Sequence, residues 1–314
     1  MSKILNNRTA LITGAARGIG KSIAENLAKF GCNIIIIDPG YSINGNHDDK
    51  NIAEKVSIDI AEKYDVETLA ITKDISDIEE INKSLEIVTK KFETLDIVIN
   101  NAAILRDGFV FKYSIEDWKK VIDINLTGAF NIISKTSKLI RNQHKQDNSY
   151  NYGRIINIIS TAGIWGNYGQ AAYASAKAAL IGLTRVTALD LSRSNITCNA
   201  IAPFAATRVT ESIVPQNSDQ EKYKNNALKV KAEFVGDLCS FLISDKGSKY
   251  TGQIFGVRAK EIFLFNQARP EHKIIRTSNN GGIEDLDLLF REKFDNNLTP
   301  LETDLEAFSN DPVI

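Results

Sequence analysis

The chain has 314 residues, of which 43% are hydrophobic and 25% are charged, and its net charge is −1 at pH 7. This length suffices for one large α/β domain, and the balanced charge argues against nucleic acid or an anionic membrane as a partner. Because no apolar run approaches the roughly 18 residues of a membrane span, and no signal peptide or peroxisomal Ser-Lys-Leu terminus is present, we expect a cytoplasmic enzyme.

Short β-branched runs alternate with amphipathic stretches through most of the chain. The predicted strands are Thr9–Thr13, Asn33–Asp38, Thr68–Thr72, Leu95–Asn100, Arg154–Ser160 and Asn195–Ile201. The predicted helices are Gly18–Phe30, Ile52–Tyr64, Ile78–Phe92, Ile115–Arg141 and Gln170–Ser192. This alternation predicts right-handed βαβ units, and hence an α/β fold with a Rossmann-like, doubly wound parallel sheet that carries helices on both faces.

The pattern favours a single dinucleotide-binding and catalytic domain over residues 1–267 and a C-terminal extension over residues 268–314. Polar stretches at Gly40–Lys50 and Asn142–Tyr152 are interpreted as surface loops. Within the extension, apolar residues recur at helical spacing, namely Leu286, Leu289, Phe290 and Phe294. We expect this tail to dock on a partner subunit or on its own domain.

Neither the cysteines nor the histidines are spaced as metal ligands. The cysteines lie apart in apolar stretches, at Cys32, Cys198 and Cys239. The histidines lie in polar loops, at His47, His144 and His272. We therefore expect buried thiols in a reducing compartment, solvated histidines and no metal site.

A glycine-rich turn, Thr13-Gly14-Ala15-Ala16-Arg17-Gly18-Ile19-Gly20, follows the first predicted strand. Glycine spacing alone is a weak signal. At a strand-to-helix turn, however, glycine lets backbone amides approach a pyrophosphate at the helix N-terminus. The turn therefore predicts a dinucleotide site.

Two side chains near this turn favour different dinucleotides. Asp38 ends the second strand, 18 residues after Gly20, where its carboxylate can accept hydrogen bonds from the adenosine ribose. It would repel a 2′-phosphate by about 4 kcal/mol per unit charge at 4 Å and an effective dielectric near 20. The guanidinium of Arg17 could instead hold that phosphate. Because Asp38 is placed more directly, we favour NAD over NADP.

Three later residues suggest acid/base chemistry. Ser160 ends the fifth strand, Tyr173 follows 13 residues on, and Lys177 lies four residues beyond it, on the same helical face. An ammonium about 4 Å from a phenol would lower its pKa by roughly three units, from about 10 towards neutrality. Tyr173 would then act as the catalytic acid/base, with Ser160 hydrogen-bonded to the substrate oxygen.

The Thr13–Gly20 turn, Asn100-Asn101-Ala102-Ala103, Asn125, Ser160 and Tyr173–Lys177 resemble the classical short-chain dehydrogenases/reductases, over roughly residues 8–257. The resemblance implies a catalytic tetrad of Asn125, Ser160, Tyr173 and Lys177, in which the asparagine distorts a helix and holds a water in a proton relay. It implies cofactor contacts by Gly14, Arg17, Gly18, Ile19, Gly20, Asp38, Asp74, Ile75, Asn101, Ala102, Tyr173, Lys177 and Pro203.

The same resemblance bears on mobility and assembly. Residues 208–231 occupy the position of the family's mobile substrate lid. The apolar run Gly252–Val257 and the following Glu261–Phe265 resemble the family's subunit-contact edge. Because such a run would be an aggregation liability if exposed, we expect a homodimer or homotetramer.

A narrower resemblance involves Asp38-Pro39-Gly40, Ile104–Asp107, Gly163–Gln170 and Cys198–Pro203. These segments resemble the (3R)-hydroxyacyl-CoA dehydrogenase unit of the peroxisomal multifunctional enzyme and its bacterial stand-alone relatives. Ala103 and Phe204 stand where the family usually has glycine, and Phe204 either shapes the substrate pocket or packs the loop. Trp165 and Tyr168 precede the catalytic helix and are candidates for substrate contact or for core packing.

We therefore predict an NAD-dependent oxidoreductase that interconverts a secondary alcohol and a ketone in a small-molecule substrate. A 3-hydroxyacyl thioester, such as an acyl-CoA, is the first choice, and a hydroxysteroid or other bulky alcohol the second. A non-catalytic dinucleotide-binding regulator or scaffold is the alternative from another class. The tyrosine–lysine pair argues against it, because a binding protein needs no acid/base catalyst.

Overall fold

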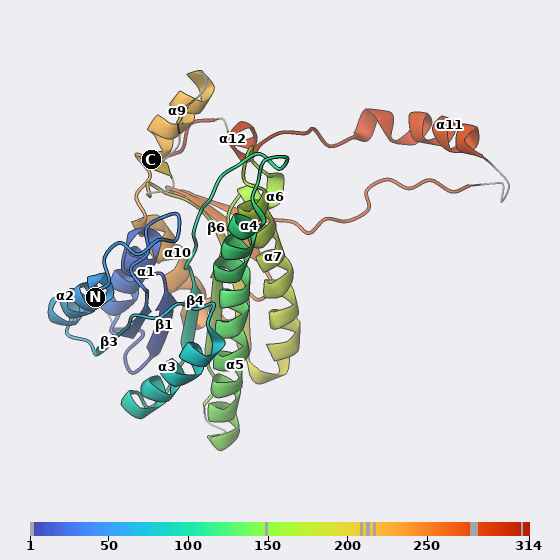
Figure 1. Ribbon diagram of the computed structural model, residues 1–314. Helices are drawn as coiled ribbons and strands as arrows, with labels where there is room; N and C mark the ends of the chain where they lie inside the picture. The colour runs from blue at the N-terminus through green and yellow to red at the C-terminus, as the bar shows by residue number, and fades with distance from the viewer. Residues whose placement is uncertain are drawn as a thin grey trace.

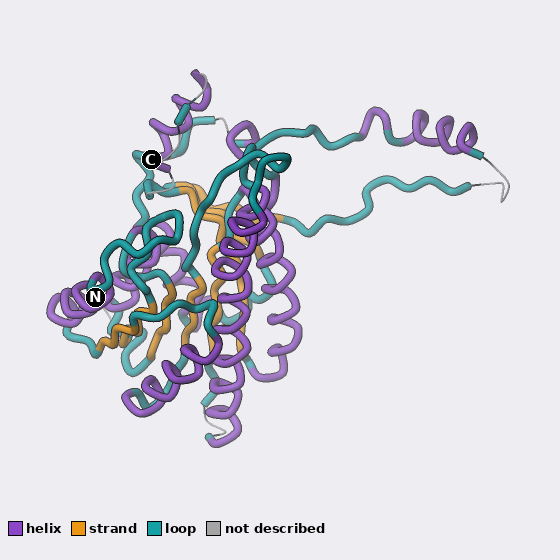
Figure 2. Tube along the Cα trace, in the orientation of Figure 1, coloured by secondary structure: helices purple, strands orange, loops and turns teal. Residues whose placement is uncertain are grey.

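The computed structural model describes residues 3–147, 150–207, 210–211, 214–215, 218–276, 282–308 and 310–314. Its centre is an eight-stranded sheet of order β3-β2-β1-β4-β5-β6-β7-β8 (Figures 1 and 2). The strands are β1 (Thr9–Thr13), β2 (Asn33–Ile37), β3 (Thr68–Ile71), β4 (Ile97–Asn100), β5 (Gly153–Ile158), β6 (Ile196–Phe204), β7 (Ile254–Arg258) and β8 (Glu261–Phe265). All neighbouring strands pair in parallel except β7 and β8. The predicted doubly wound parallel sheet is confirmed.

Helices cover both faces of this sheet. One face carries α1 (Gly18–Lys29), α2 (Ile52–Tyr64) and α10 (Glu233–Ile243). The other carries α3 (Ile78–Lys91), α5 (Ala129–Gln146) and α7 (Ala171–Leu191). The shorter helices are α4 (Ile115–Ile122), η1 (Asp123–Gly128), α6 (Ala162–Trp165), η2 (Ser192–Ser194), α9 (Ser218–Ala227), η3 (Asp245–Gly247), α11 (Ile283–Lys293), η4 (Asp295–Asn297) and α12 (Asp304–Ala307).

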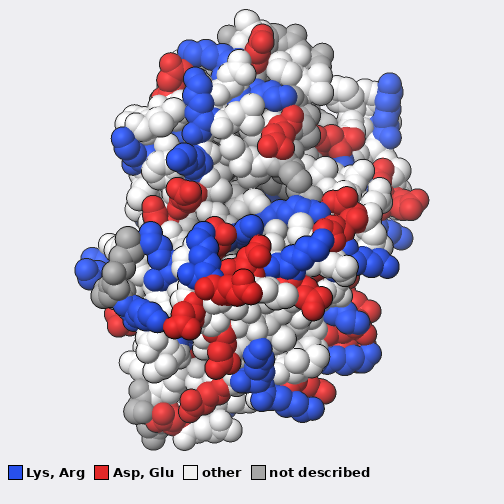
Figure 3. Space-filling model, turned by 90° about the vertical axis from the view of Figure 1, so that its left-hand side faces the viewer, with Lys and Arg blue, Asp and Glu red and all other residues white. Residues whose placement is uncertain are grey.

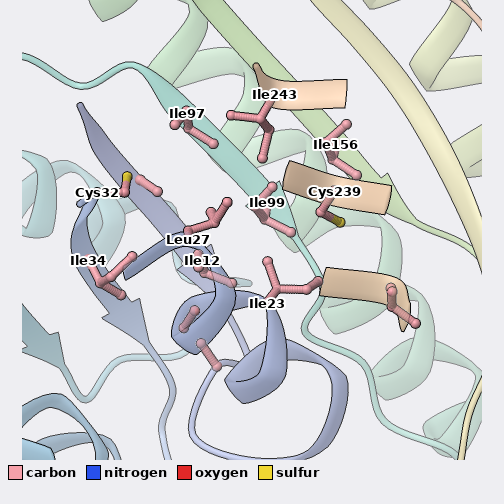
Figure 4. Packing of buried hydrophobic residues seen from close by; sticks show 14 of the residues in the cluster. Ile12, Ile23, Leu27, Cys32, Ile34, Ile97, Ile99, Ile156, Cys239 and Ile243 are labelled. Carbon is pink, nitrogen blue, oxygen red and sulfur yellow. The ribbon is translucent and has the colours of Figure 1, made fainter. Parts of the chain in front are cut away.

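The two faces of the sheet are filled by alternate residues of the same strands. Along β1, Ile12 packs into the cluster formed with α1 and α10, whereas Leu11 packs into the opposite cluster with α3 and α5. Figure 4 shows Ile23 of α1 and Cys239 of α10 beside the strand residues of the first cluster. All three cysteines are buried and free, as predicted. This packing fixes the carboxyl ends of the strands, where the candidate site lies.

The helix predicted over residues 115–141 is interrupted. It consists of α4, the π-helical turn η1 and α5, which continues to Gln146. Within the turn, the Asn125 side chain bonds both backbone groups of Ile104, through Oδ1 at 2.8 Å and Nδ2 at 2.9 Å. Turns of this kind are common at functional sites, where they redirect a side chain or a backbone group.

The C-terminal extension has two parts that behave differently. α11 lies on an arm that projects from the body of the molecule, and it has no buried residue (Figure 1). Residues 304–308 and 310–314 return to the domain, where Arg258 donates to the backbone oxygen of Asn310 at 2.9 Å. The end of the tail thus contacts its own domain, whereas α11, whose apolar residues motivated the expectation of docking on a partner subunit or on the domain, has no buried residue.

The surface carries both signs of charge. On the face shown in Figure 3, lysine and arginine side chains are interspersed with aspartate and glutamate. Among the described residues, every helix is too short or too polar to cross a bilayer.

Candidate active site

The glycine turn lies at the carboxyl end of β1 and forms part of a cavity of about 560 Å³. Gly14 and Gly18 have positive φ, of 64° and 54°, which favours glycine. A Cβ on Gly14 would lie 2.7 Å from Ala102 Cα, and one on Gly20 would lie 2.4 Å from Gly14 O. A Cβ on Gly18 would meet only Thr207 Cγ2, at 4.0 Å. Packing thus excludes any side chain larger than hydrogen at Gly14 and Gly20, whereas the space around Gly18 is open.

The first turn of α1 has the properties of an anion site. Arg17 precedes the helix without any side-chain cap, and no acidic residue lies in the first turn. Arg17, Gly18 and Ile19 all line the cavity. Free backbone N–H groups at a helix N-terminus bind phosphate, so this turn fits the pyrophosphate of a dinucleotide.

Asp38 and Arg17 have separate partners inside the protein. The Asp38 carboxylate accepts hydrogen bonds from Ala16 N at 3.0 Å and Gly40 N at 2.8 Å, and it lines the cavity. The Arg17 guanidinium donates to Tyr41 O at 3.1 Å and pairs with Asp48 at 2.8 Å. Arg17 is therefore engaged by the loop after β2, whereas the Asp38 carboxylate faces the cavity.

The ends of β3, β4 and β6 supply the other predicted cofactor residues. Asn101 Nδ2 donates to Thr13 O at 3.0 Å and Gly14 O at 2.9 Å, which ties β4 to the glycine turn. Asp74 accepts a hydrogen bond from the Tyr41 hydroxyl at 2.8 Å. The cavity wall includes Asp74, Ile75, Asn101, Ala102 and Pro203. Sequence reasoning missed Tyr41, because a loop tyrosine carries no periodic or motif signal.

The residues of the predicted tetrad come from β5, α7 and η1. Lys177 is buried, at 2% exposure, and its Nζ donates to Ile158 O at 2.7 Å, next to the end of β5. The same Nζ lies 5.8 Å from the centre of the Tyr173 ring. Ser160, Tyr173 and Lys177 line the cavity, and Asn125 bonds the cavity residue Ile104. The structure thus brings Ser160, Tyr173 and Lys177 together in one cavity and places Asn125 behind its wall, bonded to Ile104.

The predicted lowering of the Tyr173 pKa is wrong. Burial of the phenol raises its pKa to about 12, and a hydrogen bond with Ser160 offsets this only in part. Burial also lowers the pKa of Lys177 to about 8. The spacing i, i+4 predicts proximity but not desolvation, and desolvation disfavours the charged form of both groups.

Trp165 and Tyr168 have different places. Tyr168 lines the cavity and is 73% exposed, at its mouth. Trp165 packs edge-on against Phe265 and Phe308, with ring centres 5.7 and 5.2 Å apart, and does not appear among the described lining residues. Trp165 therefore packs against aromatic residues of β8 and the tail, and its contact with a substrate stays a prediction.

Segments late in the chain also line the cavity. Phe204 lines it and also packs on Phe308, with ring centres 4.6 Å apart, so the packing role is observed and the substrate role stays a prediction. Of the predicted lid, residues 208, 209, 212, 213, 216 and 217 lie outside the described residues. Its described members that line the cavity are Thr210, Val214, Tyr223 and Ala227. Asp304 and Leu305 of α12 complete the wall, and no sequence signal identified them.

The part of the chain that the structure describes shows no cluster of metal ligands. It contains no group of three or more His, Cys, Asp or Glu side chains that could hold an ion. His47 packs edge-on against Tyr41, and the His144 ring contacts Tyr150 O.

The fold and this site define a class of protein, a dinucleotide-dependent oxidoreductase that acts on CH–OH groups. The family model described as short chain dehydrogenase matches residues 8–220, and the chain belongs to this family. It resembles a 3-oxoacyl-[acyl-carrier-protein] reductase from Synechocystis sp., with 36% identity over 255 residues, which is 81% of this chain and 96% of the relative. A reductase of the same name from Aquifex aeolicus is 35% identical over 257 residues, covering 81% of this chain and 96% of the relative.

A solved structure is similar throughout. The crystal structure of a short chain dehydrogenase from Mycobacterium avium superposes with a TM-score of 0.80 at 25% identity, covering 96% of this chain and 99% of that one. The scaffold alternative is set aside, because the family is one of nicotinamide-dependent enzymes. The narrower resemblance to the peroxisomal dehydrogenase unit is not shown by these relatives.

Proposed function

We propose that the enzyme interconverts the 3-hydroxy and 3-oxo forms of an acyl thioester, with NAD(H) as its hydride carrier. The observation that carries this proposal is the single cavity in which the glycine turn, Asp38 and the Ser160–Tyr173–Lys177 group all take part. The names of the curated relatives support a 3-oxoacyl thioester as the substrate class.

Each residue has a role in this reaction. The Ser160 hydroxyl donates a hydrogen bond to the substrate oxygen, and the Tyr173 phenol gives or takes the proton at that oxygen. Lys177 lies beside Tyr173 and would hydrogen-bond the nicotinamide ribose, as the family resemblance implies. Asn125, in its π-helical turn, would hold the water of the proton relay. When bound, the nicotinamide supplies or accepts the hydride.

The preference for NAD rests on the neighbours of Asp38 and Arg17. A 2′-phosphate beside the Asp38 carboxylate would be repelled. Arg17 would have to leave Asp48 and Tyr41 O before it could offset that repulsion. The ribose hydroxyls of NAD, in contrast, donate hydrogen bonds to a carboxylate.

A substrate panel with purified enzyme tests the proposal. (3R)-Hydroxyacyl-CoAs of several chain lengths, their (3S) isomers and hydroxysteroids are each incubated with NAD+ or NADP+, and NAD(P)H absorbance is followed. We expect turnover of a hydroxyacyl-CoA with NAD+, and none by Tyr173→Phe. Turnover of the hydroxysteroids alone would reject the thioester assignment and favour the second substrate class.

We also propose that the protein is a homodimer or homotetramer acting in the cytoplasm. The outer strand β8 exposes Ile262 and Leu264, at 61% and 59%, on the edge of the sheet. Apolar side chains on an edge strand favour pairing with another chain. Light scattering at micromolar concentration should give two or four times the monomer mass of 34.8 kDa, and a stable monomer would reject this assembly.

A further inference from the structure

Asp304 is a carboxyl group inside the substrate end of the cavity, contributed by the C-terminal tail. It lies at the start of α12, follows the projecting arm, and lines the cavity together with Leu305. It belongs to neither the glycine turn nor the tetrad. The side chain nonetheless shares a cavity with Ser160 and Tyr173, so it lies within the same chemical environment as the reaction.

The Asp304 carboxyl is buried and only partly satisfied. The residue is 6% exposed, and its Oδ2 accepts a hydrogen bond from the Thr161 hydroxyl at 2.8 Å. Its Oδ1 is buried and has no hydrogen-bond partner. A buried polar atom without a partner costs free energy, so such an atom in a binding cavity indicates that a ligand supplies the missing partner.

The tail holds this carboxyl firmly in place. Phe308, one turn further on, packs against Trp165, Phe204 and Phe263. The backbone N–H of Asp304 donates to Gly166 O at 3.2 Å, which joins α12 to the loop after α6. The position of Asp304 therefore follows from packing on both sides rather than from an attraction to a neighbouring cation.

The chemistry around Asp304 favours a donor on the ligand rather than an anion. Asp107 lines the same cavity, and together the two carboxyl groups contribute to the raised pKa of Tyr173. The two described cations of the cavity wall are already engaged, since Arg17 pairs with Asp48 and Lys177 donates to Ile158 O. An anionic group of the substrate would meet carboxyl oxygens here, whereas a hydroxyl or an amide N–H can donate a hydrogen bond to them.

We propose that Asp304 is a specificity-determining residue, which selects substrates that carry a hydrogen-bond donor, a hydroxyl or an amide N–H, in addition to the reacting alcohol. The inference rests on the proposed function, because it assigns this contact within the thioester-binding end of that same site. In a thioester the donor lies either on the thiol portion, as an amide N–H, or on the acyl chain, as a second hydroxyl. A donor in either position would bond the same oxygen, Oδ1 of Asp304.

Two matched substrate pairs test the inference and distinguish the sources. The first pair is S-(2-acetamidoethyl) and S-(4-oxopentyl) 3-hydroxybutanethioate, which differ only in that a CH2 group replaces the amide N–H on the thiol side. The second is the S-butyl thioesters of 3,6-dihydroxyhexanoate and 3-hydroxyhexanoate, which differ in a hydroxyl on the acyl side. Initial rates with NAD+ give kcat/KM for wild type, Asp304→Ala and Asp304→Asn, and NADH binding verifies the fold of each variant.

In at least one pair, Asp304→Ala should lower kcat/KM for the donor-bearing member by about tenfold or more, the usual effect of leaving a buried hydrogen-bond donor without its partner. The donor-free member should change by less than about twofold, and Asp304→Asn, which keeps an acceptor oxygen, should lose less. Asp311→Asn is the control. This carboxylate of the same tail bonds Lys222 and Asn226 outside the cavity, so the variant should match wild type.

Two results would overturn the inference, and they differ in whether they also reject the proposed function. Equal losses for both members of both pairs would mean that Asp304 only supports the fold, with the proposed function left standing. No turnover of any of the four thioesters by the wild-type enzyme would reject the proposed function, and the inference with it.

Discussion

The two ends of the cavity are built in different ways. The cofactor end is formed by the carboxyl ends of β1, β2 and β4, where side chains bond the backbone of neighbouring strands, as Asp38 does at Ala16 N and Asn101 at Gly14 O. The substrate end is closed by α9 and α12, which come much later in the chain, and it is held by aromatic contacts of Phe308. One end thus depends on the sheet, and the other on a docked tail.

This difference separates binding of the dinucleotide from choice of the substrate. A cofactor site built on the sheet can remain fixed while the tail changes the wall that faces the substrate. Lys177 lies where the two ends meet, since it is buried beside both Ile158 O and Tyr173. Substitutions at the cofactor end, at the substrate end and at Lys177 should therefore change cofactor affinity, substrate KM and kcat in different ways.

Lys177→Ala should change both cofactor binding and turnover, because Lys177 lies where the two ends of the cavity meet. We expect kcat to fall by about a hundredfold or more, since this cation assists proton transfer, and NADH binding to weaken. In wild type, NADH affinity should also fall as pH rises through about 8, because burial lowers the pKa of Lys177 to about 8 and the charge is lost above it. Fluorescence titrations of NADH across pH would show this step, and the variant should lack it. An identical step in Lys177→Ala would assign it to another group.

Asp38→Ser should affect the cofactor end alone. Wild type should bind NADH at least about tenfold more tightly than NADPH, because a 2′-phosphate near the carboxylate is repelled. The variant should narrow that ratio while KM for the substrate stays the same. Fluorescence titration of both dinucleotides measures the ratio, and a wild-type preference for NADPH would mean that Arg17 outweighs Asp38.

Phe308→Ala should affect the substrate end alone, and by the smallest amount. Each aromatic contact contributes about 0.5–1.5 kcal/mol, and Phe308 makes such contacts with Trp165, Phe204 and Phe263. Its loss should loosen α12 and raise the substrate KM several-fold, with NADH affinity unchanged. Leu301→Ala, a fully exposed residue of the same extension, is a matched control. Weaker NADH binding in Phe308→Ala would show that the two ends are not independent.

The sequence predicted the sheet and the cofactor end because both follow from local patterns. Strand periodicity and the glycine turn involve residues close together in the chain, and so does the Tyr173–Lys177 pair. The break at Asn125 followed only from family resemblance, since the apolar pattern continues through it. Trp165, Tyr223 and Asp304 owe their places to long-range packing of the tail, which has no local signal. The pKa of Tyr173 was missed for a related reason, because desolvation depends on everything that surrounds the phenol.

The most direct test of the account is a joint measurement of turnover and NADH binding in Tyr173→Phe. The phenol acts on the substrate oxygen only in the transition state, so its loss should lower kcat by about 10²–10⁴-fold and leave NADH affinity within about twofold of wild type. Turnover of the variant at the wild-type rate would contradict the tyrosine mechanism and place the chemistry elsewhere in the cavity.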